Sequence, residues 1–139
     1  MKVLGLDPGD VWIGVAISDA LGISCRPLST ITLDELETFL TTILSKEAID
    51  TIVVGYPLTM KGLQSDQTKK IILLKEALEK KFTKAHWLLW DERLSSKRAQ
   101  TTQTSRAQSK EARHKEHAIA AAFILQGYLD WRDQQQERE

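Results

Sequence analysis

The 139-residue chain is long enough for one compact domain with a sheet and several helices. Its 19 basic and 19 acidic residues give a formal net charge of zero, so any affinity for nucleic acid must come from a local basic patch. The single cysteine, Cys25, excludes an internal disulfide framework, and no apolar run reaches the roughly 18 residues needed to span a bilayer. Since the first residues also carry no signal-peptide pattern, we expect a cytoplasmic protein that is not bound to a membrane.

Five β-rich runs along the chain predict five strands. The first three, at residues 3–6, 12–17 and 24–32, are joined by short connections, which favours antiparallel pairing. The last two, at residues 51–54 and 87–90, are each reached through a helix, so they should lie parallel to the strands they join.

Amphipathic runs and capping residues predict the helices. A capping box at residues 32–35 precedes a helix whose inner face would begin at Leu33. Residue 65 or 66 would cap a second helix, the serines at 95–96 a third, and residues 117–131 form an alanine-rich fourth. This order of elements is that of an α/β, ribonuclease H-like fold, in which helices flank a five-stranded mixed sheet.

Two segments are too polar for a packed element. Residues 101–115 contain almost no apolar side chains, so we expect a mobile basic loop there. The tail at residues 133–139 is charged and should fray. The prediction is then a single ribonuclease H-like domain over residues 1–139.

Carboxylates follow two of the predicted strands. Asp7 ends the first strand ahead of a Pro-Gly-Asp turn, and Asp91 and Glu92 end the last. In a ribonuclease H-like sheet one strand separates these two, so their Cα atoms would lie on the order of 10 Å apart, and their side chains could share a divalent cation. Such sites suit phosphodiester hydrolysis. The alternatives are that Asp7 only starts the turn and that Glu92 is a surface residue paired with Arg93.

Four motifs resemble those of a known family. They are LGLDPGDVWIGVAISD, VVGYPLTMKG, WDERLSS and HAIAAAFILQGYLD. In order and spacing they resemble the YqgF/RuvX family of pre-16S rRNA nucleases, which are related to RuvC-type Holliday junction resolvases. The resemblance implies that Asp7 and Glu92 are catalytic metal ligands for Mg²⁺ or Mn²⁺, that Arg93 faces a phosphate, and that residues 55–62 line the cleft.

The chain departs from the family pattern at two positions. The last motif normally opens with an aspartate that completes the metal site, and here that position is His117. A neutral imidazole can bind a metal, so His117 is the third candidate catalytic residue and metal ligand, and the alternative is that it only starts the helix. The second departure is Trp12, where the family usually has a basic residue, and this ring could stack on a base or simply pack.

Basic residues are concentrated near the third motif, where residues 97–115 carry a net charge of +5. This segment could hold a phosphate backbone, with the alternative that it is an ordinary solvated loop. The predicted nucleic-acid contacts are Arg93, Lys97, Arg98, Lys110, Arg113 and Lys115.

These observations predict a metal-dependent nuclease. The resemblance implies 5′-end processing of pre-16S rRNA, so RNA is the favoured partner, with a pre-ribosomal particle as a further one. One alternative is a Holliday junction resolvase acting on branched DNA. Another is a non-catalytic ribosome-assembly factor that binds nucleic acid, because His117 stands at the position of the family's third acidic ligand.

A nucleotide-binding fold of the actin and sugar-kinase type is disfavoured because a second phosphate loop is missing. The sequence leaves monomer and homodimer open.

Overall fold

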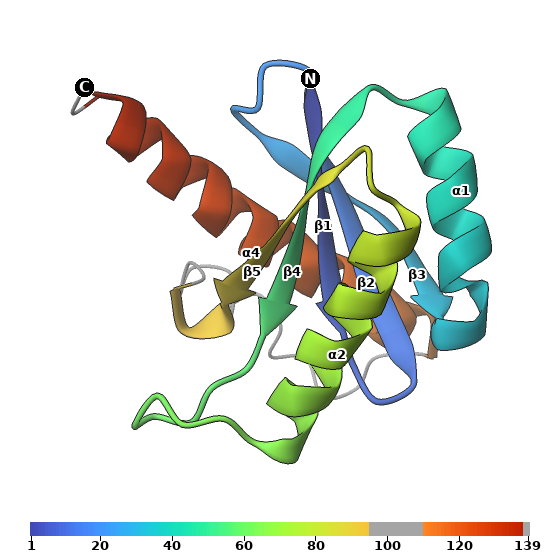
Figure 1. Ribbon diagram of the computed structural model, residues 1–139, viewed down its shortest axis with the longest axis vertical. Coiled ribbons are helices and arrows are strands. Elements are labelled where there is room, and N and C mark those ends of the chain that lie inside the picture. Colours follow the sequence, from blue (N-terminus) through green and yellow to red (C-terminus); the bar gives the residue numbers. More distant parts are fainter. Residues whose placement is uncertain (95–109, 138–139) are drawn as a thin grey trace.

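A five-stranded mixed sheet lies at the centre of the computed structural model, which describes residues 1–94 and 110–137 (Figure 1). The order across the sheet is β3-β2-β1-β4-β5. The strands are β1 (Lys2–Pro8), β2 (Trp12–Ser18), β3 (Cys25–Thr32), β4 (Ile49–Tyr56) and β5 (His86–Asp91).

The pairing of the strands confirms the predicted sheet. β1 pairs antiparallel with β2, and β2 antiparallel with β3. β1 pairs parallel with β4, and β4 parallel with β5. Since β1 and β5 flank β4, their carboxyl ends lie at the same edge of the sheet with one strand between them.

Helices cover both faces of the sheet. α1 (Leu36–Lys46) and α2 (Asp66–Lys81) lie on one face, and α4 (Lys110–Glu137) crosses the other (Figure 1). The predicted capping box ahead of α1 is confirmed, because the Thr32 side chain and backbone both bond to the Glu35 carboxylate. Leu33 was expected on the inner face of this helix but is 57% exposed, because it lies in the 3-10 turn that precedes α1.

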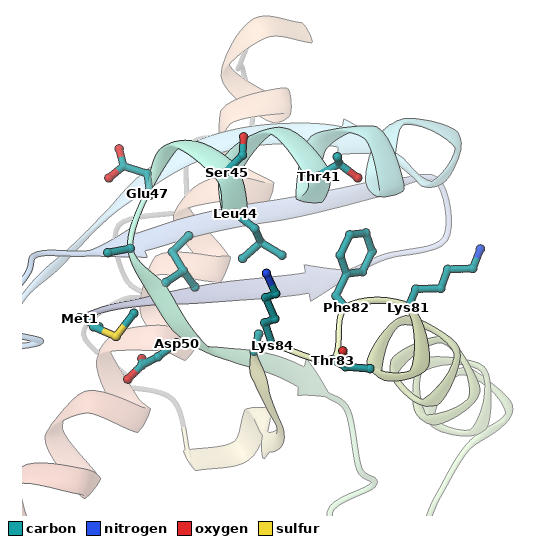
Figure 2. Close-up of a pocket in the computed structure, with 13 residues that line it drawn as sticks. Met1, Thr41, Leu44, Ser45, Glu47, Asp50, Lys81, Phe82, Thr83 and Lys84 are labelled. Atoms are coloured by element: carbon teal, nitrogen blue, oxygen red, sulfur yellow. The ribbon is translucent and has the colours of Figure 1, made fainter.

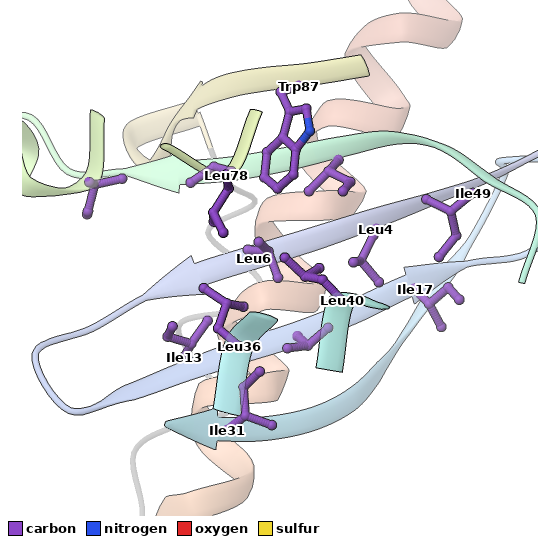
Figure 3. Close-up of a cluster of buried hydrophobic side chains, with 14 residues drawn as sticks. Leu4, Leu6, Ile13, Ile17, Ile31, Leu36, Leu40, Ile49, Leu78 and Trp87 are labelled. Atoms are coloured by element: carbon purple, nitrogen blue, oxygen red, sulfur yellow. The ribbon is translucent and has the colours of Figure 1, made fainter. Parts of the chain in front are cut away.

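The two faces have different cores. The face under α1 and α2 is packed with large aliphatic side chains, including Leu6 and Ile13 from the sheet and Leu40 from α1 (Figure 3). On the face under α4, the sheet contributes smaller side chains such as Val3, Ala16 and Val53, together with Trp90, and these pack against Leu125 and other residues of the helix. Small side chains let α4 approach the strands closely, and this approach positions the start of the helix at the edge where Asp7 lies.

The C-terminal helix is longer than predicted at both ends. Residues 110–115 were expected in the basic loop and residues 133–137 in the frayed tail, but both segments belong to α4. Tertiary contacts explain the difference. Near its start, the backbone oxygen of His114 accepts a hydrogen bond from Thr30 Oγ1 at 2.6 Å, and near its end Arg132 Nη2 donates to Gly22 O at 3.3 Å.

The helix predicted after residues 95–96 lies outside the described residues, as does the rest of the predicted basic loop. Within the described ranges, no helix is both long and apolar enough to cross a membrane.

Candidate active site

Asp7 and Glu92 meet at the carboxyl edge of the sheet. Asp7 lies near the end of β1, opposite Gly14 of β2, and Glu92 begins the 3-10 turn η2 (Glu92–Leu94) that follows β5. Their carboxyl groups form a hydrogen bond with each other. The two side chains therefore span β4, as the sequence predicts. Arg93, the alternative partner considered for Glu92, pairs with Asp91.

Gly55 leaves the space through which Glu92 reaches Asp7. It lies on β4 opposite Trp90, one residue before the end of the strand. A Cβ atom at position 55 would lie 3.4 Å from Glu92 Cγ and 2.7 Å from Ile124 Cδ1. A side chain here would have to displace the end of the Ile124 side chain and would touch the Glu92 stem, so the glycine leaves room for both under α4.

Burial makes both carboxyl groups harder to ionise. Loss of solvation is the main cause that raises the pKa of Glu92 to about 8, and the neighbouring Asp7 adds to the increase. Desolvation also raises the pKa of Asp7, although the hydrogen bond from Glu92 and the charge of His117 oppose that increase. Two carboxyl groups in contact share a proton in the metal-free protein, and a divalent cation can replace that proton.

We expect the metal-free protein to lose stability as the pH rises from 5.5 to 8.5. Both carboxyl pKa values are higher in the folded protein than in the unfolded chain, so the stabilising effect of the shared proton is complete below about pH 4.5 and is lost as the pH rises through about 8. After allowance for solvent screening, the loss is about 1–2 kcal/mol, or about 3–6 °C in Tm. Calorimetry in EDTA measures it. Glu92→Gln should remove most of this pH dependence, and an equally steep decline in that variant would contradict the assignment.

His117 lies beside the carboxyl pair, at the point where α4 comes closest to the sheet. A Cβ atom on Gly14 would lie only 1.8 Å from the His117 carbonyl oxygen, so the helix backbone rests directly on β2 next to Asp7. Among residues 1–94 and 110–137, however, no three His, Cys, Asp or Glu side chains are grouped closely enough to hold a metal ion. The role of His117 as third ligand stays a prediction.

The two carboxyl groups fit one kind of ion well. Mg²⁺ is commonly held by one or two protein carboxylates, with water and substrate phosphate filling its remaining positions. Asp7 and Glu92 supply this oxygen donor set and are already desolvated and close together. Mn²⁺ also accepts carboxylate ligands and, in addition, tolerates a histidine.

A contact between Trp12 and His114 fixes the start of α4 and was not predicted. The two ring centroids lie 4.7 Å apart in an edge-to-face arrangement, and Thr30 holds the same turn of the helix through the His114 carbonyl. The packing interpretation of Trp12 accounts for this contact. The sequence contains both residues but does not indicate that they are close. Their contact follows from the extension of α4 back to residue 110.

Arg93 is held by Asp91. Its Nε lies 3.1 and 3.0 Å from the two carboxylate oxygens, and Nη2 lies 2.7 Å from Oδ2. This pair lowers the pKa of Asp91. The free side of the guanidinium reaches the loop after β4, where Nη1 lies 3.5 Å from Thr59 O. Arg93 therefore stands one residue from Glu92 with a fixed orientation and an exposed face.

The other predicted nucleic-acid contacts are only partly described. Arg113 and Lys115 are exposed on the first turns of α4. The backbone of Lys110 begins the helix. The side chain of Lys110, together with Lys97 and Arg98, lies outside the described residues, so their roles stay predictions.

A hollow of about 670 Å³ lies at the opposite end of the sheet from the carboxyl pair. Figure 2 shows Leu44 of α1 facing Phe82 across it, with Lys84 between them. None of the residues predicted to be catalytic lines this hollow. A nucleic-acid backbone can lie across an open edge, so an enclosed pocket is not required at Asp7 and Glu92.

Comparisons with known proteins agree with this geometry. The chain is 37% identical over 135 residues to a Staphylococcus carnosus protein named "Putative pre-16S rRNA nuclease", covering 93% of this chain and 95% of that one. It is 38% identical over 137 residues to a Desulforamulus reducens protein of the same name, covering 94% and 97%.

Solved structures show the same fold. RuvC of Thermus thermophilus in complex with a Holliday junction matches with a TM-score of 0.58 at 14% identity, covering 96% of each chain. The fowlpox virus resolvase bound to junction DNA matches with a TM-score of 0.56 at 10% identity, covering 94% and 98%. The predicted ribonuclease H-like fold is confirmed. The profile of the family described as RuvX, Holliday junction resolvase, matches residues 1–131, and the chain therefore belongs to the RuvX family.

Proposed function

We propose that this protein is a metal-dependent nuclease that hydrolyses phosphodiester bonds in nucleic acid. The observation that carries the proposal is the contact between two desolvated carboxyl groups, Asp7 and Glu92, at an open edge of a ribonuclease H-like sheet. Keeping two carboxyl groups in contact away from water costs free energy unless a cation binds them. The names of the relatives, nuclease and resolvase, support the same activity.

In this proposal, each residue at the edge has a separate task. Asp7 and Glu92 would hold one or two divalent cations, Mg²⁺ or Mn²⁺, and the bound metal would supply the activation of a water and the stabilisation of charge on the leaving oxygen. Arg93, fixed by Asp91, faces the phosphate backbone beside the scissile bond. Gly55 on β4 and Gly14 on β2 have no side chains. The space they leave allows Glu92 and the start of α4 to approach Asp7.

The favoured substrate is ribosomal RNA, in 5′-end processing of the 16S precursor within a pre-ribosomal particle. The names of the curated relatives support this choice. The structural neighbours that bind Holliday junctions support the alternative of branched DNA. Because the described basic residues Arg93, Arg113 and Lys115 are suited to phosphates rather than base edges, we expect selection by shape and strandedness.

The proposal is tested with purified protein and four substrates: single-stranded RNA, an RNA stem with its 16S-precursor 5′ extension, duplex DNA and a four-way junction. We expect cleavage with Mg²⁺ or Mn²⁺ and none in EDTA. Faster cleavage of the RNA stem would support rRNA processing, and faster cleavage of the junction would support resolution. No cleavage of any substrate with either metal would overturn the nuclease proposal.

His117 favours a second candidate function, a ribosome-assembly factor that binds nucleic acid without cutting it. Here an imidazole occupies the position of the third acidic ligand, and the described side chains form no three-residue metal cluster. If the missing carboxylate is the defect, His117→Asp should raise cleavage by at least about tenfold, which corresponds to about 1.4 kcal/mol of transition-state stabilisation. Initial rates at saturating Mn²⁺ measure it, with His117→Asn as the uncharged control. Equal rates in all three proteins would exclude this explanation.

A further inference from the structure

The loop after β4 projects an apolar side chain into solvent. The segment at residues 57–63 stands away from the body of the protein between β4 and α2 (Figure 1). Met60, near its tip, is 99% exposed. A methionine in this position gains nothing from packing within the chain, although it is flexible and apolar and suits a binding surface.

The loop is nevertheless well ordered by its own hydrogen bonds. Gly62 N donates to Thr59 O at 2.8 Å, Thr59 N donates to Leu63 O at 3.0 Å, and Leu63 N also donates to Thr59 Oγ1 at 3.0 Å. Gly62 has a φ of +79°, which lets the chain close this turn. Met60 is therefore presented on a defined turn, so little loop entropy would be lost when it binds.

The same loop is tied to the candidate active site. Thr68, at the start of α2, donates a hydrogen bond to Pro57 O, which fixes the base of the loop. Arg93 Nη1 lies 3.5 Å from Thr59 O, and a Cβ atom on Gly62 would lie 3.6 Å from the same guanidinium nitrogen. Because Arg93 follows Glu92 directly in the chain, the loop that presents Met60 lies against a residue next to the candidate active site.

We propose that Met60 is a wedge that inserts between stacked bases of the nucleic acid next to the cleavage site. This inference rests on the proposed function and adds a substrate contact to it. Proteins commonly use methionine and other apolar side chains to unstack a base step, at a cost of a few kcal/mol that is offset by new contacts with the distorted nucleic acid. The wedge would favour substrates with weak stacking, such as branch points, bulges and the ends of stems.

The charges around the loop favour nucleic acid over a protein partner. The exposed cations nearby are Lys61 on the loop, Lys69 and Lys70 on the first turns of α2, and Arg93. The acids in this region include Asp66, which is exposed at the start of α2, and Asp91, which pairs with Arg93. An apolar tip set among cations matches a base stack between two phosphate backbones.

The test uses an RNA stem-loop and a four-way DNA junction, each carrying 2-aminopurine beside the loop or branch point. The Asp7→Asn protein in EDTA binds without cutting, so the fluorescence reports unstacking alone. We expect a rise of about threefold or more on binding, and loss of most of that rise in Asp7→Asn with Met60→Ala. Met60→Leu should retain it. Leu21→Ala is the matched control, because Leu21 is 79% exposed on the turn after β2, at the other end of the sheet.

Each outcome decides the proposal. An unchanged fluorescence on binding, or an equal rise with Met60→Ala, would overturn the wedge even if the wild-type protein cleaves nucleic acid with Mg²⁺. A rise that depends on Met60 would support the wedge even if the wild type cleaves nothing, in which case only the nuclease proposal fails. If Met60→Ala leaves both unstacking and cleavage unchanged but abolishes capture of a protein from the lysate, the tip is a protein contact and the wedge is wrong.

Discussion

Asp7→Asn and Glu92→Gln are each expected to lower metal-dependent cleavage by at least about 10³-fold. Either substitution removes one of the two carboxylates that would hold the metal, and the structure places these side chains in direct contact. The loss should appear in the rate at saturating substrate, because both substitutions leave unchanged Arg93 and the basic residues of α4, which are the proposed contacts with the nucleic-acid backbone. Single-turnover cleavage with Mg²⁺ and with Mn²⁺ measures it.

Two controls separate lost chemistry from lost folding. Both amides are nearly isosteric with the acids and remove a repulsive charge, so the Tm in EDTA at pH 8.5 should be equal to or above that of the wild type. Calorimetric titration with Mg²⁺ should show binding to the wild type and none to either variant. The matched variant Asp91→Asn, which loses only the partner of Arg93, should retain metal binding. Full cleavage by Asp7→Asn would exclude a role for the pair.

Gly14→Ala is expected to cause the largest loss of stability, about 3 kcal/mol or about 10 °C in Tm. Its new Cβ atom would lie 1.8 Å from His117 O and 3.0 Å from Ala118 N. Both are backbone atoms, so no side chain can rotate to relieve the overlap, and α4 has to move away from β2. Urea denaturation and calorimetry measure the loss.

Gly5→Ala provides the comparison on the same face of the sheet. Its Cβ atom would lie 2.9 Å from Leu125 Cβ and 3.3 Å from Ala121 O, so a smaller shift of α4 relieves the overlap, and we expect a loss of about 1 kcal/mol. Gly14→Ala should also lower the cleavage rate more than Gly5→Ala does, because Gly14, unlike Gly5, lies under the start of α4 beside Asp7. Equal destabilisation by the two substitutions would show that α4 does not rest on Gly14 as closely as the structure indicates.

Much of the fold could be predicted because it depends on local patterns. Strand runs, short connections and capping residues identify the mixed sheet, and the end of each strand then determines which carboxylates share an edge. Asp7 and Glu92 could be placed together for this reason. The prediction needed only the strand order, because each acid comes at or directly after the end of its strand.

The remainder of the site depends on contacts between distant segments. The polar residues at 110–115 have no apolar periodicity, so nothing local indicates that Trp12 and Thr30 would hold them as helix. Arg93 had two acidic neighbours in the sequence, and only the direction of the 3-10 turn η2 decides that Asp91 is its partner. The exposure of Met60 likewise depends on the conformation of the turn at residues 59–62, which the amino-acid sequence between Gly55 and Gly62 does not determine.

The position of α4 has a consequence for biosynthesis. α4 comes after all five strands in the chain, and among the described elements it is the helix that covers the face of the sheet containing Val3, Ala16 and Val53. Because chains are made from the N-terminus, that apolar face stays in contact with water or chaperones until residues 110–137 have been made and have left the ribosome. A nascent chain whose α4 is still inside the ribosome therefore cannot pack the start of that helix, which carries His117, against Gly14 beside Asp7.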